Sequence, residues 1–288
     1  MNKKLIIILG VLFCSLSAIF GKFSASSPAV LVFYRMTMTV LISVPLTLAK
    51  NREELLSFRG KPLYLSALSG VFLGLHLVTY FDSLKYTSIS SSSTLVSTEV
   101  FFVAFALVFI FKEKVSKKSW LGILVTFLGT CLIAAADFGG GSNVIKGDLL
   151  ALLACFLMSV YTLIGRYVRK SGVSTNTYTC VVYTAAAVTV AILTAVTGES
   201  VYPVSGVTLL CALGLTVFCT FLGHSIYSWG LKFVQASYIS NAKMLNPVFS
   251  TIWGLVIFRE VPGIFGILGS ITVIAGVLIY SNNLPAEE

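Results

Sequence analysis

The sequence is short of charge. Only 11% of its 288 residues are Asp, Glu, Lys or Arg, whereas 57% are hydrophobic and the mean hydropathy is +0.94. Soluble domains carry about 25% charged residues, because charge keeps a folded surface in water. This composition excludes an ordinary soluble protein and indicates an integral membrane protein.

Motifs of catalysis and energy supply are also missing. The sequence contains no HExxH or GxSxG motif and no Walker lysine motif, which argues against an intramembrane hydrolase and against ATP as the driving force. Its six cysteines show no metal-ligand spacing and all fall in apolar segments, where free cysteine is ordinarily a packing residue. We therefore expect a protein that is not an enzyme and that has no cofactor and no metal.

Uncharged stretches divide the chain at regular intervals. A helix that crosses a bilayer needs about 20 mostly apolar residues. Stretches of that kind predict ten spans, over residues 5–21, 28–49, 63–84, 88–111, 119–137, 148–168, 176–197, 206–231, 236–258 and 263–281. Strands of a membrane barrel would alternate with polar residues, and these stretches do not. The sequence therefore predicts an all-α membrane protein with ten transmembrane helices.

Positive residues predict the orientation of these spans. With ten spans both ends of the chain lie on one side of the membrane, and only Lys22, Lys85, Lys146 and Arg259 would lie on the other side. Because cytoplasmic segments carry an excess of Lys and Arg, we expect cytoplasmic termini and a multi-pass protein of the cytoplasmic membrane. The net charge of +9 follows from this bias and gives no support to nucleic-acid binding.

Two long stretches of the chain, beginning at Tyr80 and at Tyr227, match each other without a gap, and the first spans of the two halves agree more weakly. The aligned pairs include Tyr80 with Tyr227, Lys85 with Lys232, Gly122 with Gly269 and Gly129 with Gly276. We predict a first five-helix repeat over residues 1–140 and a second over 145–283. Because five is odd, the second half enters the membrane from the opposite face, so the repeats are inverted. Inverted repeats are a common plan of secondary transporters, with the substrate near the midplane.

A short pattern recurs towards the end of each half. It comprises Leu231-Lys232-Phe233, Asn246-Pro247-Val248-Phe249 and Glu260, and it is echoed at Leu84-Lys85-Tyr86 and Glu113. With this pattern, and with Tyr34 and Arg35 in the second span, the chain resembles the EamA-type members of the drug/metabolite transporter superfamily. It departs from them at Val100, where the family usually has a proline. The resemblance implies ten helices, cytoplasmic termini and export or uptake of small solutes.

Ionisable residues fall at the centre of two equivalent spans. Glu99 lies in the middle of the fourth span, Asn246 in the middle of the ninth, and Lys243 one turn away. A charge at this depth costs roughly 2.5–3.5 kcal/mol and needs a partner or water. On a continuous helix Lys243, Asn246, Ser250 and Trp253 share one face. We expect that face, together with the hydroxyl-rich tract 87–101, to line a watery cavity between the halves.

Three further polar candidates lie in the predicted spans: Arg35 deep in the second, His76 in the third, and Tyr80 near the outer end of the third. The complete set of substrate-binding candidates is Arg35, His76, Tyr80, Glu99, Lys243, Asn246, Ser250 and Trp253, and Glu99 is also the candidate for a coupling proton. Structural roles are the alternative for each. Glu99 could simply pair with Lys243 or Arg35, His76 and His224 could be packing residues, and Tyr80 could belong to an interfacial belt.

Taken together, these features predict a secondary transporter of a small polar metabolite. The substrate would be an amino acid or a similar zwitterionic or anionic solute, moved by alternating access with proton coupling or exchange. A membrane scaffold or receptor without transport, and an exporter of cationic or aromatic drugs, are the alternatives. The expected partners are the lipid bilayer and the small-molecule substrate, and the protein is compatible with a monomer or a homodimer.

Overall fold

The computed structural model describes residues 2–87, 89–110, 112, 116–135, 144–259 and 263–283. Within these residues every regular element is a helix, as the sequence predicts. The helices are α1 (Lys3–Cys14), α2 (Ser17–Phe23), α3 (Pro28–Ser57), α4 (Lys61–Ser83), α5 (Ile89–Ser97), α6 (Glu99–Phe109), α7 (Lys117–Ala135), α8 (Val144–Lys170), α9 (Thr175–Val196), α10 (Gly206–Gly214), the π-helix η1 (Leu215–His224), α11 (Ser225–Gly230), α12 (Ala236–Lys243), α13 (Asn246–Phe258) and α14 (Ile264–Asn282).

These helices follow the expected spans closely. In the described part of the chain, six segments are long and apolar enough to cross a membrane: Lys3–Phe23, Pro28–Ser57, Lys61–Ser83, Val144–Lys170, Thr175–Val196 and Gly206–Gly230. Two shorter apolar helices, Leu95–Phe109 and Ile264–Tyr280, lie within further expected spans. The count of ten and the inverted arrangement stay predictions. Glu113 and Glu260 of the repeated pattern, and residues 136–143 at the end of the first expected half and just after it, lie outside the described residues.

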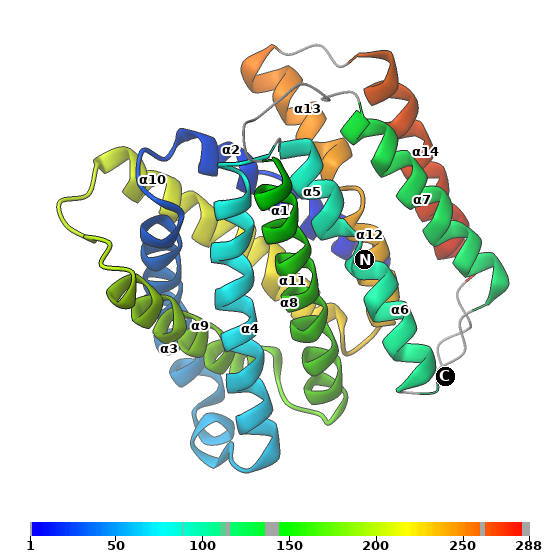
Figure 1. Ribbon diagram of the computed structural model, residues 1–288. Helices are drawn as coiled ribbons and strands as arrows, with labels where there is room; N and C mark the ends of the chain where they lie inside the picture. Colours follow the sequence, from blue (N-terminus) through cyan, green and yellow to red (C-terminus); the bar gives the residue numbers. More distant parts are fainter. Residues whose placement is uncertain are drawn as a thin grey trace.

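Three of the expected spans are interrupted near their centres (Figure 1). The first span is divided into α1 and α2 at Ser15 and Leu16, and the fourth into α5 and α6 at Thr98. The ninth is divided into α12 and α13 at Met244 and Leu245. We expected continuous helices at these places, and that expectation is wrong. Thr98 and Leu245 are equivalent positions in the expected repeat, so the fourth and ninth expected spans are broken at matching points.

Each break is a tight turn whose polar groups are satisfied locally. An N–H donates to the carbonyl three residues earlier, at 3.1–3.3 Å, from Leu16 to Phe13, from Thr98 to Leu95 and from Met244 to Asn241. The hydroxyls of Ser15 and Thr98 also donate backwards to carbonyls, both at 2.6 Å. Pro247, which has no N–H, occupies the first turn of α13, where that group is not needed. Such local bonding is required because lipid offers backbone groups no partner.

Glycines bring the helix pairs into close contact. Helix α7 packs against α14, and α4 packs against α8 and α9, and α7 and α14 lie side by side in Figure 1. A Cβ at Gly276 of α14 would lie 2.4 Å from the Thr126 backbone nitrogen of α7, and one at Gly70 of α4 would lie 2.3 Å from the Val182 carbonyl oxygen of α9. Small residues at such crossings allow the backbones to approach, which is how helices associate in membranes.

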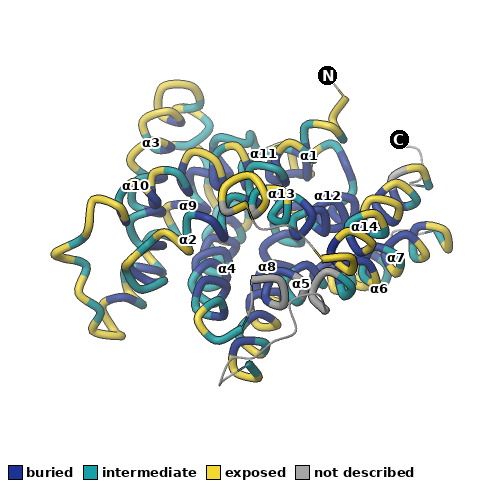
Figure 2. The backbone as a smooth tube through the Cα atoms, turned by 90° about the horizontal axis from the view of Figure 1, so that it is seen from above, coloured by how far each residue is buried: buried dark blue, intermediate teal, exposed yellow. Residues whose placement is uncertain are grey.

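The buried side chains form two clusters, and each cluster combines both halves of the chain. One cluster joins α3 and α4 to α8, α9 and η1, through residues such as Leu73 and Tyr183. The other joins α1 and α6 to α12 and α14, through residues such as Val103 and Tyr238. Cys14 packs against both. Seen from above, buried residues gather towards the middle of the molecule (Figure 2).

Helices α3 and α9 bind each other at both ends through carboxylates. Glu54 near the end of α3 accepts from the Ser174 N–H at 2.7 Å and from the Thr177 hydroxyl at 2.9 Å, and Ser174 is the N-cap of α9. At the opposite end Glu199, just after α9, accepts from the hydroxyl of Ser27, the N-cap of α3. A carboxylate at a helix N-terminus is favoured by the helix dipole. These two contacts therefore fix the α3–α9 pair.

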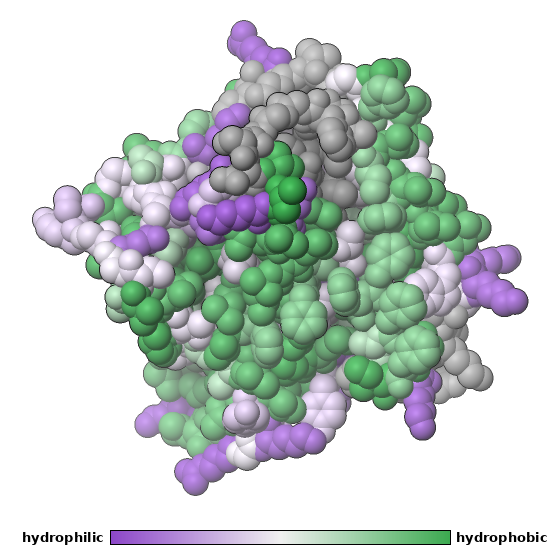
Figure 3. All heavy atoms as spheres, viewed as in Figure 1, coloured by the Kyte–Doolittle hydropathy of each residue, from purple (hydrophilic) through white to green (hydrophobic). Residues whose placement is uncertain are grey.

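Large apolar side chains cover the outside of the molecule. Phe109 is 74% exposed, Leu41 68% and Val256 65%. Figure 3 shows a broad hydrophobic area over the middle of one face, with hydrophilic side chains above and below it. A contiguous apolar surface of this extent is costly in water and is stable against lipid tails.

Candidate functional site

A cavity lies where the broken helices meet. Its volume is about 80 Å³, which holds several water molecules because one water needs roughly 10–15 Å³. Six of the eight candidate residues line it, namely Arg35, His76, Tyr80, Glu99, Lys243 and Asn246. Ser93 and Ser97 of the hydroxyl-rich tract line it as well. Residues from α3, α4, α5, α6, α12 and α13 thus meet at one cavity, and their role in binding stays a prediction.

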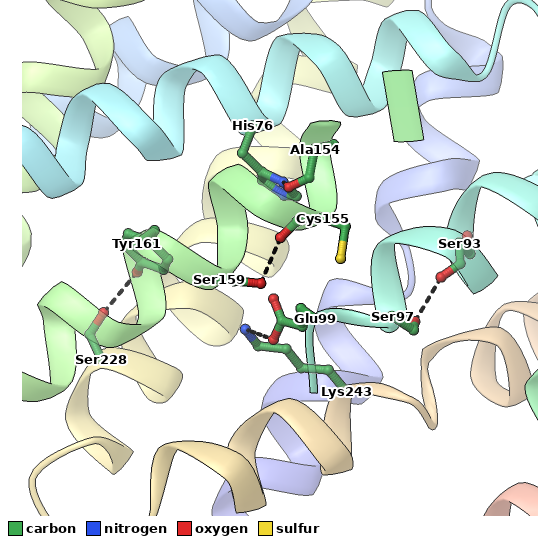
Figure 4. Close-up of polar contacts among 10 residues, drawn as sticks. All are labelled: His76, Ser93, Ser97, Glu99, Ala154, Cys155, Ser159, Tyr161, Ser228 and Lys243. Atoms are coloured by element: carbon green, nitrogen blue, oxygen red, sulfur yellow. Dashed lines mark hydrogen bonds and ion pairs between the residues drawn. The ribbon is translucent and has the colours of Figure 1, made fainter. Parts of the chain in front are cut away.

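Glu99 and Lys243 form an ion pair at this cavity (Figure 4). The Lys243 Nζ lies 2.9 Å from Glu99 Oε1, and the two side chains are 11% and 2% exposed, respectively. The Lys243 ammonium also lies 5.0 Å from the centre of the Tyr227 ring, within range of a cation–π contact. Since Glu99 comes from the first half of the chain and Lys243 from the second, the pair links the expected repeats.

The helix breaks place these two charges favourably. Glu99 is the first residue of α6, and Lys243 is the last residue of α12. The N-terminal end of a helix carries partial positive charge and the C-terminal end partial negative charge, so each side chain meets the end that favours it, by about 0.3–1 kcal/mol or somewhat more when buried. The breaks therefore offset part of the cost of placing charge inside the membrane.

Arg35 is anchored by the π-helix and has no ion pair with Glu99 among the described residues. Its Nε donates to the Thr220 hydroxyl at 3.0 Å, and its backbone carbonyl accepts from the Thr216 hydroxyl at 2.9 Å. Both threonines belong to η1, and a π-helix is frequent at functional sites because it redirects side chains. The structural alternative of an Arg35–Glu99 pair is therefore wrong.

Four buried atoms at the cavity have no hydrogen-bond partner within the described part of the chain. They are Nη2 of Arg35, Oε2 of Glu99, Nδ1 of His224 and Oδ1 of Asn246. Buried polar atoms are nearly always satisfied, since an unsatisfied one costs about 1–3 kcal/mol. The Arg35 atom is a donor, while the Glu99 and Asn246 atoms are acceptors. The cavity thus presents both an unpartnered donor and unpartnered acceptors to its interior.

Aromatic rings form another part of the wall. His76 Nδ1 donates to the Ala154 carbonyl at 2.8 Å, and its ring stacks on Tyr80 at 6.2 Å. His224 makes edge contacts with Tyr161 and Tyr227. His76 is therefore both a satisfied packing residue and a cavity residue. His224, for which the sequence analysis gave only a packing role, lines the cavity too.

Ser250 and Trp253 are not among the residues that line the cavity. The Trp253 indole N–H donates to the Ser15 hydroxyl at 2.8 Å, and the Ser250 hydroxyl donates to the Ser15 carbonyl at 3.4 Å. The expected single face from Lys243 to Trp253 is wrong because the helix is broken at Met244 and Leu245. These two side chains instead hold the break in the first span.

Two cysteines that the sequence analysis treated as packing residues border the cavity. Cys14 ends α1 and Cys219 lies in η1. The Cys14 thiol donates to the Cys219 carbonyl at 3.3 Å, which ties the first span to the π-helix. No motif in the sequence could have indicated this contact, because it depends on the break after α1 and on the π-helical course of η1. No group of three or more His, Cys, Asp or Glu that could hold a metal ion was found within the described residues.

Comparison with known proteins relates this chain to membrane transporters. The model of the EamA-like transporter family matches residues 3–135 and 145–282. An uncharacterized transporter of Archaeoglobus fulgidus is 30% identical over 97% of this chain and 98% of its own length. An uncharacterized transporter of Clostridium kluyveri is 27% identical over 98% and 94%, respectively.

One relative has a stated substrate. The pseudopaline exporter CntI of Pseudomonas aeruginosa is 25% identical over 93% of this chain and 92% of its own length. A solved crystal structure superposes with a TM-score of 0.79 at 20% identity, covering 97% of this chain and 96% of the other. At that identity the likeness concerns the fold alone.

Proposed function

Because the chain belongs to the EamA-like transporter family, we propose that it is a secondary transporter of a small zwitterionic or anionic solute such as an amino acid. Family membership and the apolar helices make it a multi-pass membrane transporter. The substrate class rests on the cavity. The observation that supports this class is a set of buried atoms without a hydrogen-bond partner among the described residues. Arg35 Nη2 is a donor, whereas Glu99 Oε2 and Asn246 Oδ1 are acceptors.

Charge in the cavity supports an anionic group on the substrate. Arg35 and Lys243 carry two positive charges against the single negative charge of Glu99. Lys243 is already paired with Glu99, whereas Arg35 has no ion pair within the described residues. A carboxylate that accepts from Arg35 would complete the pairing, by a charge-assisted bond of the stronger kind.

Alternating access is supported by the broken helices. Helices interrupted near mid-membrane, with their ends at the site, recur in transporters built from inverted repeats. In this chain the interruptions at Thr98 and Leu245 fall at equivalent positions of the repeat. We propose ten spans in two inverted halves, residues 1–140 and 145–283, with cytoplasmic termini. Export is the favoured direction because one relative is an exporter, of pseudopaline.

Flux through reconstituted vesicles tests this proposal. Proteoliposomes loaded with the standard amino acids should release at least one of them faster than protein-free liposomes. Arg35→Gln should reduce that release about tenfold or more, as expected for loss of a charged hydrogen bond. Arg52→Gln is the matched control, because Arg52 is exposed on the same helix. A scaffold or receptor would release nothing, and an exporter of cationic drugs would not depend on Arg35.

A further inference from the structure

The position of the Lys243 ammonium has the features of a binding site for a cationic group. It lies 2.9 Å from a carboxylate oxygen of Glu99 and 5.0 Å from the Tyr227 ring centre, and Lys243 is the last residue of α12. A carboxylate, an aromatic face and a helix C-terminus are the three means by which proteins favour an ammonium ion. Here all three converge on a side chain of the protein itself.

The acceptor atoms around the Lys243 ammonium can accept more hydrogen bonds than Lys243 donates. Glu99 Oε2 and Asn246 Oδ1 are both buried without a partner among the described residues, and both residues line the cavity. An ammonium group has three donors and a carboxylate has about four acceptor positions. A second ammonium arriving from the cavity could therefore bind Glu99 before Lys243 leaves it.

We infer that Glu99, Tyr227 and Asn246 form the subsite for the ammonium group of the substrate, and that Lys243 occupies this subsite as a tethered cation until substrate arrives. This inference rests on the proposed function. It adds where the cationic group of the substrate binds and which side chain competes with it for that position. The arriving ammonium takes Glu99 from Lys243, while the substrate carboxylate binds Arg35.

Such competition would also couple binding to movement. Glu99 begins α6 in the first half, and Lys243 ends α12 in the second. When the substrate ammonium displaces the Lys243 ammonium from Glu99, the ion pair between the two halves is lost. The states with and without substrate therefore differ by the Glu99–Lys243 contact. A ligand changes a conformational equilibrium only through such a difference in contacts.

Chemical rescue tests the subsite without knowledge of the substrate. Lys243→Ala removes the side chain beyond Cβ, and n-propylammonium supplies the missing three carbons and the ammonium. Propylammonium chloride should raise the melting temperature of purified Lys243→Ala by about 2 °C at a few times its Kd, relative to sodium chloride. Wild-type protein, whose subsite is filled by Lys243, should show less than half of that shift.

Two controls give the result its meaning. The double variant Glu99→Gln with Lys243→Ala should not respond, because the carboxylate is gone. Sodium propionate should not stabilise Lys243→Ala. If Lys243→Ala does not fold alone, its folded yield should recover when propylammonium is present during purification, and failure to recover would overturn the inference.

Other outcomes also separate the inference from the proposed function. No response of folded Lys243→Ala to propylammonium overturns the cation subsite even if amino acids are transported. A clear response in a protein that transports no amino acid leaves the subsite intact and refutes the proposed function instead.

Discussion

The Glu99–Lys243 pair should show strong coupling in a double-mutant cycle. The two side chains are 2% and 11% exposed, and their charged atoms are 2.9 Å apart. Removal of one partner from a buried pair costs about 3–5 kcal/mol because the other charge is left uncompensated. Since the cavity beside the pair has room for water that would relieve part of this cost, we expect about 3 kcal/mol for Glu99→Gln and for Lys243→Met.

The double variant should be more stable than either single variant, because it buries no unpaired charge. Thermal unfolding in detergent measures the cycle, and 3 kcal/mol corresponds to a fall of roughly 6 °C for a chain of this size. Asp82→Asn is the matched control, since Asp82 and Lys85 form a pair at 3.1 Å whose side chains are 34% and 46% exposed, and pairs open to solvent contribute about 0–1 kcal/mol. Additive effects of the two single substitutions would refute the reasoning.

Three further predictions follow from the site and the helix contacts. Glu99→Gln should flatten the pH dependence of transport in proteoliposomes, and an unchanged pH profile would remove Glu99 from proton coupling. Glu54→Gln should cost about 1.5–3 kcal/mol of stability by weakening the charged bonds to the N-cap of α9, whereas Glu53→Gln, at an exposed neighbouring position, should cost little. Gly276→Ala should cost about 1–3 kcal/mol of stability, because its Cβ would meet the Thr126 backbone at 2.4 Å. Gly263→Ala is the control and should be tolerated, because the space around Gly263 is open. Equal melting temperatures for the two variants would contradict the close crossing of α7 and α14.

The positions of the long helices could be predicted from the sequence. The expected span 63–84 is α4 (Lys61–Ser83), and the expected span 176–197 is α9 (Thr175–Val196). This succeeds because charge is so costly in lipid that charged residues mark the ends of each span. The place of Glu99 and Lys243 at one cavity was also predicted, since two charges at mid-depth need each other or water.

The helix breaks could not be predicted in the same way. Residues 97–99 contain no proline or glycine, and a Ser or Thr in a membrane helix ordinarily bonds its own backbone without ending the helix. At the break the Thr98 hydroxyl contacts the Cys155 thiol of α8 at 3.2 Å, a tertiary contact that the local sequence does not contain. The residues on one face of a helix can be predicted from their spacing only while the helix is continuous. Because this helix is broken at Met244 and Leu245, Ser250 and Trp253 were wrongly assigned to the cavity.

The π-helix was beyond sequence reasoning for a related reason. Its extra residue per turn brings Thr220 towards Arg35 and places Cys219 and His224 at the cavity. Hydrophobic periodicity cannot separate this helix from an ordinary one over ten residues. His224 was noted only because it occupies nearly the same place in the eighth expected span as His76 does in the third.

Stabilisation by matched ligands tests the central claim most directly. Each standard amino acid should be compared with the amine and the carboxylic acid that share its side chain, by their effect on the melting temperature of the wild-type protein. The cavity holds Arg35 and Glu99 together, so the best amino acid should stabilise the protein more than either of its two single-charge counterparts. Equal or greater stabilisation by the amine or by the acid alone would contradict a site built for both charges.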